Sequence, residues 1–303
     1  MNLALLRQVV PLLTGEFTLA TLKQLRQDPV LGEYFLAHYG NGPENQIFDA
    51  LAADHYHLFG LEVFPYGTVF FNEDAQLGGP EAAMVANAFL EAQLEPPSEP
   101  DQLGQELSLL VHLLEQKPQM ASDFLRSRLM SWYFCFLAAV VRMEHPFFNP
   151  LFQQVTQTLT ELGYALPGEA TAIPEPSLGG AELLSLEDTG LSDITRFLAT
   201  PRYSGVFLSR KTIKDLADLV EIPVGFGTRS QLLPQLFYSA IDYGHLPELL
   251  TQLLEYFRAI LEDYHTWEKT WPGGLDYWKE RCHQSIDLLE RMRQEAMDSR
   301  IRP

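Results

Sequence analysis

Apolar residues recur along this chain mostly at three- and four-residue intervals, the spacing that places them on one face of a helix. Residues 103–114 show this clearly, with leucine or valine at positions 103, 107, 110, 111 and 114. Residues 124–140 carry apolar side chains on nearly every face, which is typical of a helix at the centre of a bundle. Pro146 ends this stretch, because a residue that precedes proline avoids the helical conformation.

The same periodicity predicts five helices in the second half of the chain, over 191–198, 212–220, 230–243, 247–266 and 277–297. Ahead of the 103–114 helix, Ser98 is the predicted N-cap, Pro100 falls in the first turn and Asp101 lies near the positive end of the dipole. Gly67–Phe71 is strand-like but too short to build a sheet. The pattern therefore predicts an all-α protein, a helical bundle followed by a smaller helical C-terminal domain.

Prolines and glycines between residues 163 and 180 interrupt the helical pattern. They predict a domain over 1–165, a linker over 166–181 and a C-terminal domain over 182–303. The first of these domains has 7 basic and 19 acidic residues, and the last has 14 and 19. The two parts therefore differ in charge as well as in position.

The net charge of −19 argues against nucleic-acid binding by the whole surface, because that function needs a basic footprint. Between Arg26 and Lys117 the chain has no lysine or arginine but fifteen carboxylates. Two readings stay open for this stretch. It is either a solvated acidic surface or a field that attracts a cationic ligand and raises its association rate.

No pattern in the sequence supplies a catalytic centre. There is no phosphate loop, no nucleophile elbow and no zinc helix of the His-Glu-x-x-His type. Cys135 and Cys282 are far apart, and His55 and His57 would point in different directions on a helix. We therefore expect no enzyme, no metal and no cofactor.

Two further patterns have both a structural and a functional interpretation. Residues 208–214 are locally basic and could open a DNA-recognition helix, but Ser209 capping an ordinary surface helix explains them better. Tryptophans 267, 271 and 278 either close the core of a small helical domain, which we favour, or form an aromatic docking patch.

The N-terminus lacks the basic start of a secretory signal, and the longest apolar run, 132–141, is about half of what a bilayer crossing needs. We expect a cytoplasmic protein without stable membrane insertion.

Three segments of the N-terminal half resemble motifs of the TorD/DmsD/NarJ family of molybdoenzyme chaperones. Residues 64–70 (Phe-Pro-Tyr-Gly-Thr-Val-Phe) resemble its Pro-Tyr-x-Ser-Val-Tyr segment, and residues 99–107 resemble its Glu-x-Pro-Asp-His-Leu-x-x-Glu-Leu motif. Trp132 followed by residues 145–148 (His-Pro-Phe-Phe) is similar to the tryptophan helix and the His-Pro-Phe-Tyr that follows it. The resemblance covers roughly residues 45–160, with Gln102 where the family has histidine.

The resemblance implies a TorD-like, all-helical chaperone without a catalytic step, whose partner is a molybdenum-containing or related oxidoreductase subunit or its twin-arginine leader. Client arginines would need carboxylates, and an apolar client stretch would need a groove. The alternative is a helical scaffold for a non-redox client, and a homodimer stays open. Asp101 is either a ligand for the client, which we favour, or a residue that stabilises a helix N-terminus. The predicted peptide-binding residues are Tyr66, Glu99, Pro100, Asp101, Gln102, Leu103, Glu106, Trp132 and Phe147.

Overall fold

The computed structural model describes residues 3–73, 77–166, 168, 173–177, 179–180, 183 and 189–301, with the backbone alone at 299–301. Within these residues no strand forms, and the isolated β-bridge recorded there pairs Tyr66 with Gln102. The predicted all-α class is confirmed. Contacts group the chain into two compact units: unit 1 comprises residues 1–72 and 76–172, and unit 2 comprises residues 73–75 and 173–303. The functional domain limits stay a prediction, because compactness is not independent folding.

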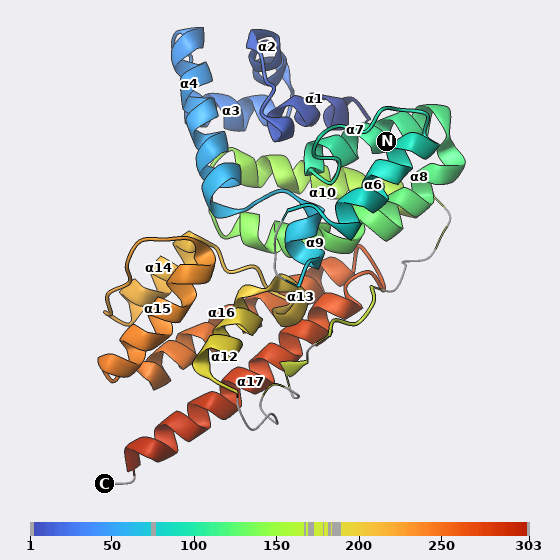
Figure 1. Cartoon of the computed structure of the whole chain (residues 1–303). Coiled ribbons are helices and arrows are strands. Elements are labelled where there is room, and N and C mark those ends of the chain that lie inside the picture. Colours follow the sequence, from blue (N-terminus) through green and yellow to red (C-terminus); the bar gives the residue numbers. More distant parts are fainter. Residues whose placement is uncertain are drawn as a thin grey trace. The chain divides into compact units, whose positions relative to one another are not determined.

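Unit 1 holds helices α1 to α10, of which Figure 1 labels all but α5, together with two segments of π-helix, η1 and η2. Their bounds are α1 Leu3–Thr14, α2 Leu19–Gln27, α3 Leu31–Tyr39, α4 Glu44–His55, η1 Tyr56–Glu62, α5 Gly67–Phe71, α6 Pro80–Glu91, α7 Leu103–Gln116, α8 Pro118–Phe124, η2 Leu125–Leu129, α9 Met130–Val141 and α10 Phe148–Ala165.

Helix α9 is the centre of unit 1, as its apolar pattern predicts: every residue from Met130 to Val140 is buried. Phe136 packs there on Trp132 and Phe152, with ring centroids 5.7 and 5.4 Å away. The helical stretch Pro118–Val141 is long and apolar enough to cross a membrane, but 78% of its most apolar window is buried inside the protein. Such burial is that of a core helix, and burying each large side chain stabilises the unit by roughly 1.5–3 kcal/mol.

Two local predictions in unit 1 are wrong. Gly67–Phe71 is a short helix, α5, rather than strand-like, because its turn is closed by side-chain and backbone contacts from residues 101–103. Helix α7 begins at Leu103 with Gln102 as its N-cap, so Ser98 caps no helix and Pro100 lies outside the first turn.

The helices of unit 2 are α12 Leu191–Ala199, α13 Pro201–Ser204, α14 Arg210–Leu219, α15 Arg229–Asp242, α16 Leu246–Glu268 and α17 Asp276–Ile301. They confirm the five predicted helices and add α13, which is too short for a periodic signal. Ser209 caps α14, as expected, by accepting a hydrogen bond from the Thr212 amide at 3.0 Å. Trp278 and Trp271 are buried and Trp267 is half-buried, which favours the core interpretation of the tryptophans.

Gly205 allows α13 to approach the backbone of α17 closely. Its φ is +75°, and a Cβ there would lie 2.6 Å from the Cys282 nitrogen. The Tyr264 hydroxyl donates to the Gly205 carbonyl at 2.7 Å, and Ser285 donates to the Ser204 carbonyl at 2.8 Å. Glycine is required here both for the backbone angle and for the space.

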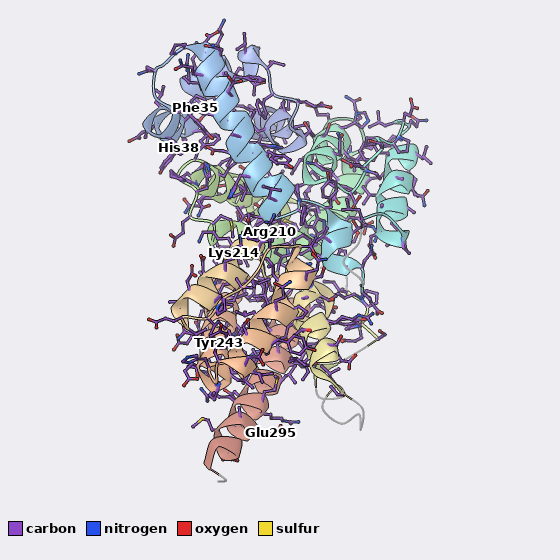
Figure 2. The ribbon with its side chains drawn as sticks, turned by 60° about the vertical axis from the view of Figure 1, so that its left-hand side comes forward. Phe35, His38, Arg210, Lys214, Tyr243 and Glu295 are labelled. Atoms are coloured by element: carbon purple, nitrogen blue, oxygen red, sulfur yellow. The ribbon has the colours of Figure 1, made fainter. Side chains whose placement is uncertain are left out.

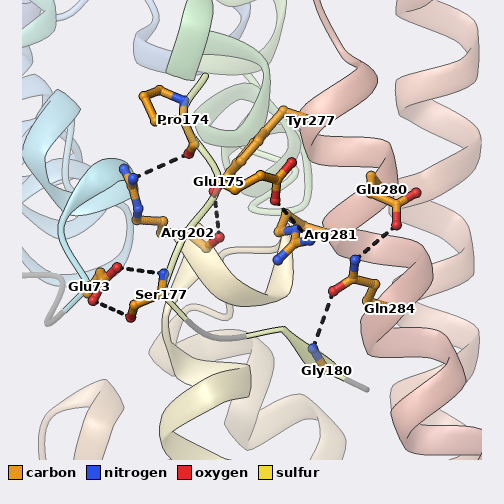
Figure 3. Close-up of polar contacts among 10 residues, drawn as sticks. All are labelled: Glu73, Pro174, Glu175, Ser177, Gly180, Arg202, Tyr277, Glu280, Arg281 and Gln284. Carbon is orange, nitrogen blue, oxygen red and sulfur yellow. Dashed lines mark hydrogen bonds and ion pairs between the residues drawn. The ribbon is translucent and has the colours of Figure 1, made fainter. Parts of the chain in front are cut away.

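Within unit 2, residues 173–177 and 179–180 lie along α13 and α17 (Figure 3). Arg281 pairs with Glu175 at 3.2 Å, and Arg202 donates to the Pro174 carbonyl at 3.3 Å. The Ser177 amide and hydroxyl donate to Glu73 at 2.9 and 2.7 Å. Residues 173–177 and 179–180 of the predicted linker therefore have specific contacts in unit 2, whereas the Leu166 carbonyl accepts a hydrogen bond from Arg126 in unit 1. Residues 167, 169–172, 178 and 181 of that linker lie outside the described residues.

Candidate functional site

Two of the motif segments, distant in sequence, are joined by their backbones. Tyr66 and Gln102 form the β-bridge, the Gly67 amide donates to the Asp101 carbonyl at 3.0 Å, and the Leu103 amide donates to the Pro65 carbonyl at 2.8 Å. The start of α5 and the start of α7 are thereby held side by side. These two motifs thus form one site in unit 1.

Asp101 faces the inside of this site, with an exposed fraction of 3%. Its Oδ2 accepts a hydrogen bond from the Thr68 amide at 2.9 Å, which satisfies a first-turn donor of α5. The carboxylate therefore stabilises a helix N-terminus, although it is that of α5 and not of the helix that follows it in sequence. Contact between Asp101 and a client stays a prediction.

Gln102 uses both ends of its amide. The Oε1 accepts from the Gly104 and Gln105 amides at 2.6 and 3.2 Å, and the Nε2 donates to the Leu13 carbonyl at 2.5 Å. It therefore caps α7 and ties it to the end of α1. Neither contact requires a titratable group, so glutamine in place of histidine fits a positioning role.

Tyr66 and Glu99 form the solvent-facing part of the site. The Tyr66 hydroxyl donates to Glu99 Oε2 at 3.0 Å, and Glu99 is exposed whereas Tyr66 is half-buried. Burial, followed by the hydrogen bond to Glu99, raises the pKa of Tyr66 to about 12. The tyrosine therefore stays a neutral donor at physiological pH. The other predicted site residues are buried: Pro100, Asp101, Gln102, Leu103, Glu106, Trp132 and Phe147.

Glu106 is a buried acid at the base of the site, with an exposed fraction of 1%. Burial and the nearby Asp101 carboxylate raise its pKa well above the ordinary range, against smaller opposite effects of Trp132 and Arg128. Among the described residues, neither Glu106 Oε2 nor the Trp132 indole nitrogen has a hydrogen bond of normal geometry. The hollow beside them measures about 10 Å³, which is too small for a guanidinium group. An enclosed Glu106 whose pKa is raised is therefore poorly suited to clamp a client arginine.

A larger groove of about 480 Å³ lies between α6, α7 and α8. Met84, Met120 and Phe124 supply its apolar lining, and the exposed carboxylates Glu91 and Asp123 also line it. Arg128 lines both this groove and the small hollow beside Glu106. The sequence did not predict this groove, because its lining comes from separate helices and only the acidic stretch gave a local signal.

Phe147 and His145 belong to the last motif, which serves the start of α10. His145 Nδ1 accepts hydrogen bonds from the Phe147 and Phe148 amides, both at 3.2 Å. Phe147 is fully buried, with its ring 5.4 Å from that of Phe35 and 5.7 Å from that of Tyr39. It therefore packs α10 against α3, in the core rather than in a surface groove.

Comparison with known proteins agrees with this architecture. The sequence model of the nitrate reductase delta subunit family matches residues 23–142, a segment that includes the 64–70 and 99–107 motifs but ends before His145. No curated protein and no solved structure matches the chain. The family consists of chaperones for molybdoenzyme maturation and is not itself catalytic, in agreement with the non-enzyme prediction. Residues 23–142 are therefore similar to the nitrate reductase delta subunit (NarJ/TorD-type) family of chaperones.

Proposed function

We propose that unit 1 binds the N-terminal segment of a molybdenum-containing or related oxidoreductase subunit in the groove between α6 and α8. Binding there would hold the client during cofactor insertion, assembly or export, and a twin-arginine leader is the ligand that we favour. The observation that carries this proposal is the 480 Å³ groove, which combines methionine and phenylalanine side chains with two exposed carboxylates.

The chemistry of the groove fits an amphipathic, basic segment. Met84 and Met120 are adaptable apolar side chains, which suit client sequences that vary in detail. Glu91 and Asp123 can accept paired hydrogen bonds from client arginines. Because residues 27–116 contain no lysine or arginine, α6 and α7 add no positive charge to the groove; its basic neighbours are Arg128 in the lining and Lys117, which donates to the Glu91 carbonyl.

Tyr66 and Glu99 are the second proposed contact. Glu99 is an exposed carboxylate held in place by the Tyr66 hydroxyl, so a client arginine can reach it without rearrangement of the core. The buried members of the motif, Asp101, Gln102 and Glu106, would act by keeping this surface in shape. We therefore assign direct binding to the exposed residues and positioning to the buried ones.

The test is calorimetric titration of the full chain with a peptide that carries an arginine pair followed by an apolar stretch, taken from an oxidoreductase N-terminus. We expect the double variant Glu91→Gln/Asp123→Asn to bind at least tenfold more weakly, which corresponds to about 1.4 kcal/mol. The matched control is Glu33→Gln/Asp49→Asn, which removes two exposed carboxylates of unit 1 that do not line the groove. Equal affinity of the groove variant and wild type would refute the assignment of the groove.

The alternative is a scaffold for a non-redox client. The identity of the client distinguishes it from the proposed chaperone. Co-purification of the full chain from its native host, followed by mass spectrometry, should recover an oxidoreductase subunit. If wild-type protein binds no oxidoreductase peptide and the recovered client carries no redox cofactor, the chaperone assignment at the level of the client fails.

A further inference from the structure

Two histidines and an aspartate meet at one point of unit 1. Asp54 Oδ2 lies 3.0 Å from His38 Nε2 and 3.2 Å from His145 Nε2. His38 is in the last turn of α3, where Figure 2 labels it together with Phe35, and Asp54 is in the last turn of α4. His145 precedes α10. The cluster thus connects the consecutive helices α3 and α4 to the start of α10, which is distant from them in sequence.

These are also the donor types of a zinc site, but the hydrogen bonds of His145 disfavour a metal. Its Nδ1 accepts from two backbone amides, so the lone pair is on Nδ1 and the proton of the neutral ring is on Nε2. A metal on Nε2 would move that proton to Nδ1, where it would face the Phe147 and Phe148 amide hydrogens. Histidines that bind metals instead donate their second N–H to an acceptor.

We propose that His38, Asp54 and His145 form an acid-sensitive latch that fastens α3 and α4 to the start of α10. In the closed latch, the neutral His145 donates from Nε2 to Asp54 and accepts at Nδ1 from the α10 backbone. One added proton on Nδ1 removes that acceptor, and the new Nδ1–H then faces the amide N–H groups of Phe147 and Phe148. The cap of α10 is then lost, and the contact of Phe147 with Phe35 and Tyr39 loses its support.

The charged surroundings determine the direction of the response. His38 and Tyr39 of α3, Asp54 of α4 and His57 of η1 face the cluster. Burial lowers the pKa of His145, and the opposing effect of Asp54 does not restore it. Burial also acts to raise the pKa of Asp54, but the combined effects of His38, Tyr39 and His145 outweigh it, so this pKa is lowered.

The direction in which pH changes the stability of the latch depends on whether the latched or the released state binds a proton at the higher pH. An unfolded or released His145 binds a proton below about pH 6.5, whereas the latched ring does so only at lower pH. Stability of the latch therefore falls as the pH decreases from about 6.5 toward the lowered pKa of His145. Asp54 keeps its charge over this range, because its pKa is below the ordinary value for aspartate.

Hydrogen–deuterium exchange of the full chain at pH 7.5 and 5.5, corrected for intrinsic rates, tests the latch. In wild type, protection of α3 and of the first turn of α10 should fall at least tenfold at the lower pH, whereas α9 stays protected. His145→Asn should remove this dependence, because the asparagine oxygen can accept the same amides and does not titrate. An equal loss in wild type and variant, or no loss in either, refutes the proposal.

Nitrogen NMR of wild type provides a readout that does not depend on the variant folding. The latch requires the Nε2–H tautomer of His145 at pH 7.5, and the opposite tautomer contradicts it. Titration of the protein with ZnCl₂ alone tests whether the cluster is a metal site instead. Stoichiometric zinc binding that is lost in His38→Gln would replace the latch by a metal site.

Discussion

Asp101 and Gln102 show how motif residues can serve a binding surface from within. Both side chains are buried, and both end on backbone groups: Asp101 on the Thr68 amide, and Gln102 on α7 and on the Leu13 carbonyl. Gly104 permits the close approach of α1, since a Cβ there would lie 2.7 Å from the Thr14 side chain. At the scale of single residues, the buried motif side chains therefore fix the backbone geometry of the site. Tyr66 and Glu99 form the part of the site that faces solvent.

Replacement of Asp101 separates a positioning role from a ligand role. Asp101→Asn should lower the free energy of unfolding by about 1 kcal/mol, because a charge-assisted hydrogen bond to the Thr68 amide becomes a neutral one. Asp101→Ala should cost about 1–3 kcal/mol, since it leaves a buried amide without an acceptor. Urea denaturation measures both, with Glu99→Gln as the exposed control that should change stability little. If Asp101→Asn is as stable as wild type but loses peptide affinity, the carboxylate contacts the client directly.

Glu106 should make the stability of unit 1 depend on pH in the direction opposite to the latch. Its folded-state pKa is raised, so the unfolded chain loses this proton first as the pH rises above about 4.3. The stability that the protonated Glu106 contributes is therefore lost as the pH rises from about 4.3 to the raised pKa of Glu106. Glu106→Gln should be more stable than wild type at pH 7, by roughly 1–3 kcal/mol. The two proteins should converge near pH 4, and a destabilised variant at pH 7 would contradict this account.

At the scale of elements, the sequence predicted helices well where one local pattern decides them. The all-round apolar stretch gave α9, and the one-sided periodicity gave α7 and the five helices of unit 2. It failed at α5, where Val69 and Phe70 favour a strand but a carboxylate 33 positions away closes a helical turn. The groove and the latch were missed for the same reason. Their residues share no local pattern, and only the packing of several helices brings them together.

Gly205 is an element-scale position that is sensitive to a single added methyl group. Gly205→Ala should destabilise unit 2 by more than about 2 kcal/mol, because the new Cβ would meet the Cys282 nitrogen at 2.6 Å and φ is +75°. The matched control is Gly244→Ala, which has the same φ of +75° but nothing within 4 Å of the added carbon. The control should lower the free energy of unfolding by about 1 kcal/mol, which is the cost of a positive φ at a residue with a Cβ. Equal effects on thermal unfolding would show that the close approach to α17 does not matter.

For the whole molecule, the distribution of charge matters more than its sum. The chain carries −19 overall, yet residues 27–116 contain no lysine or arginine, whereas unit 2 holds most of the basic residues. A cationic peptide therefore meets a more uniformly acidic surface on unit 1. Diffuse charges of this kind act on the rate of encounter, whereas residues that touch the ligand act on the rate of dissociation.

This difference predicts which unit receives the client, and it can be measured in the intact chain by stopped-flow mixing with the arginine-pair peptide. Glu33→Gln/Asp49→Asn, in unit 1, should lower the association rate constant about twofold in low salt and leave dissociation unchanged. At about 0.15 M salt the effect should shrink, because screening acts over about 8 Å. The matched pair in unit 2, Asp242→Asn/Glu255→Gln, removes two exposed carboxylates and should change neither rate. A slower association for the unit 2 pair alone would mean that the client approaches unit 2, and the assignment of binding to unit 1 would have to be given up.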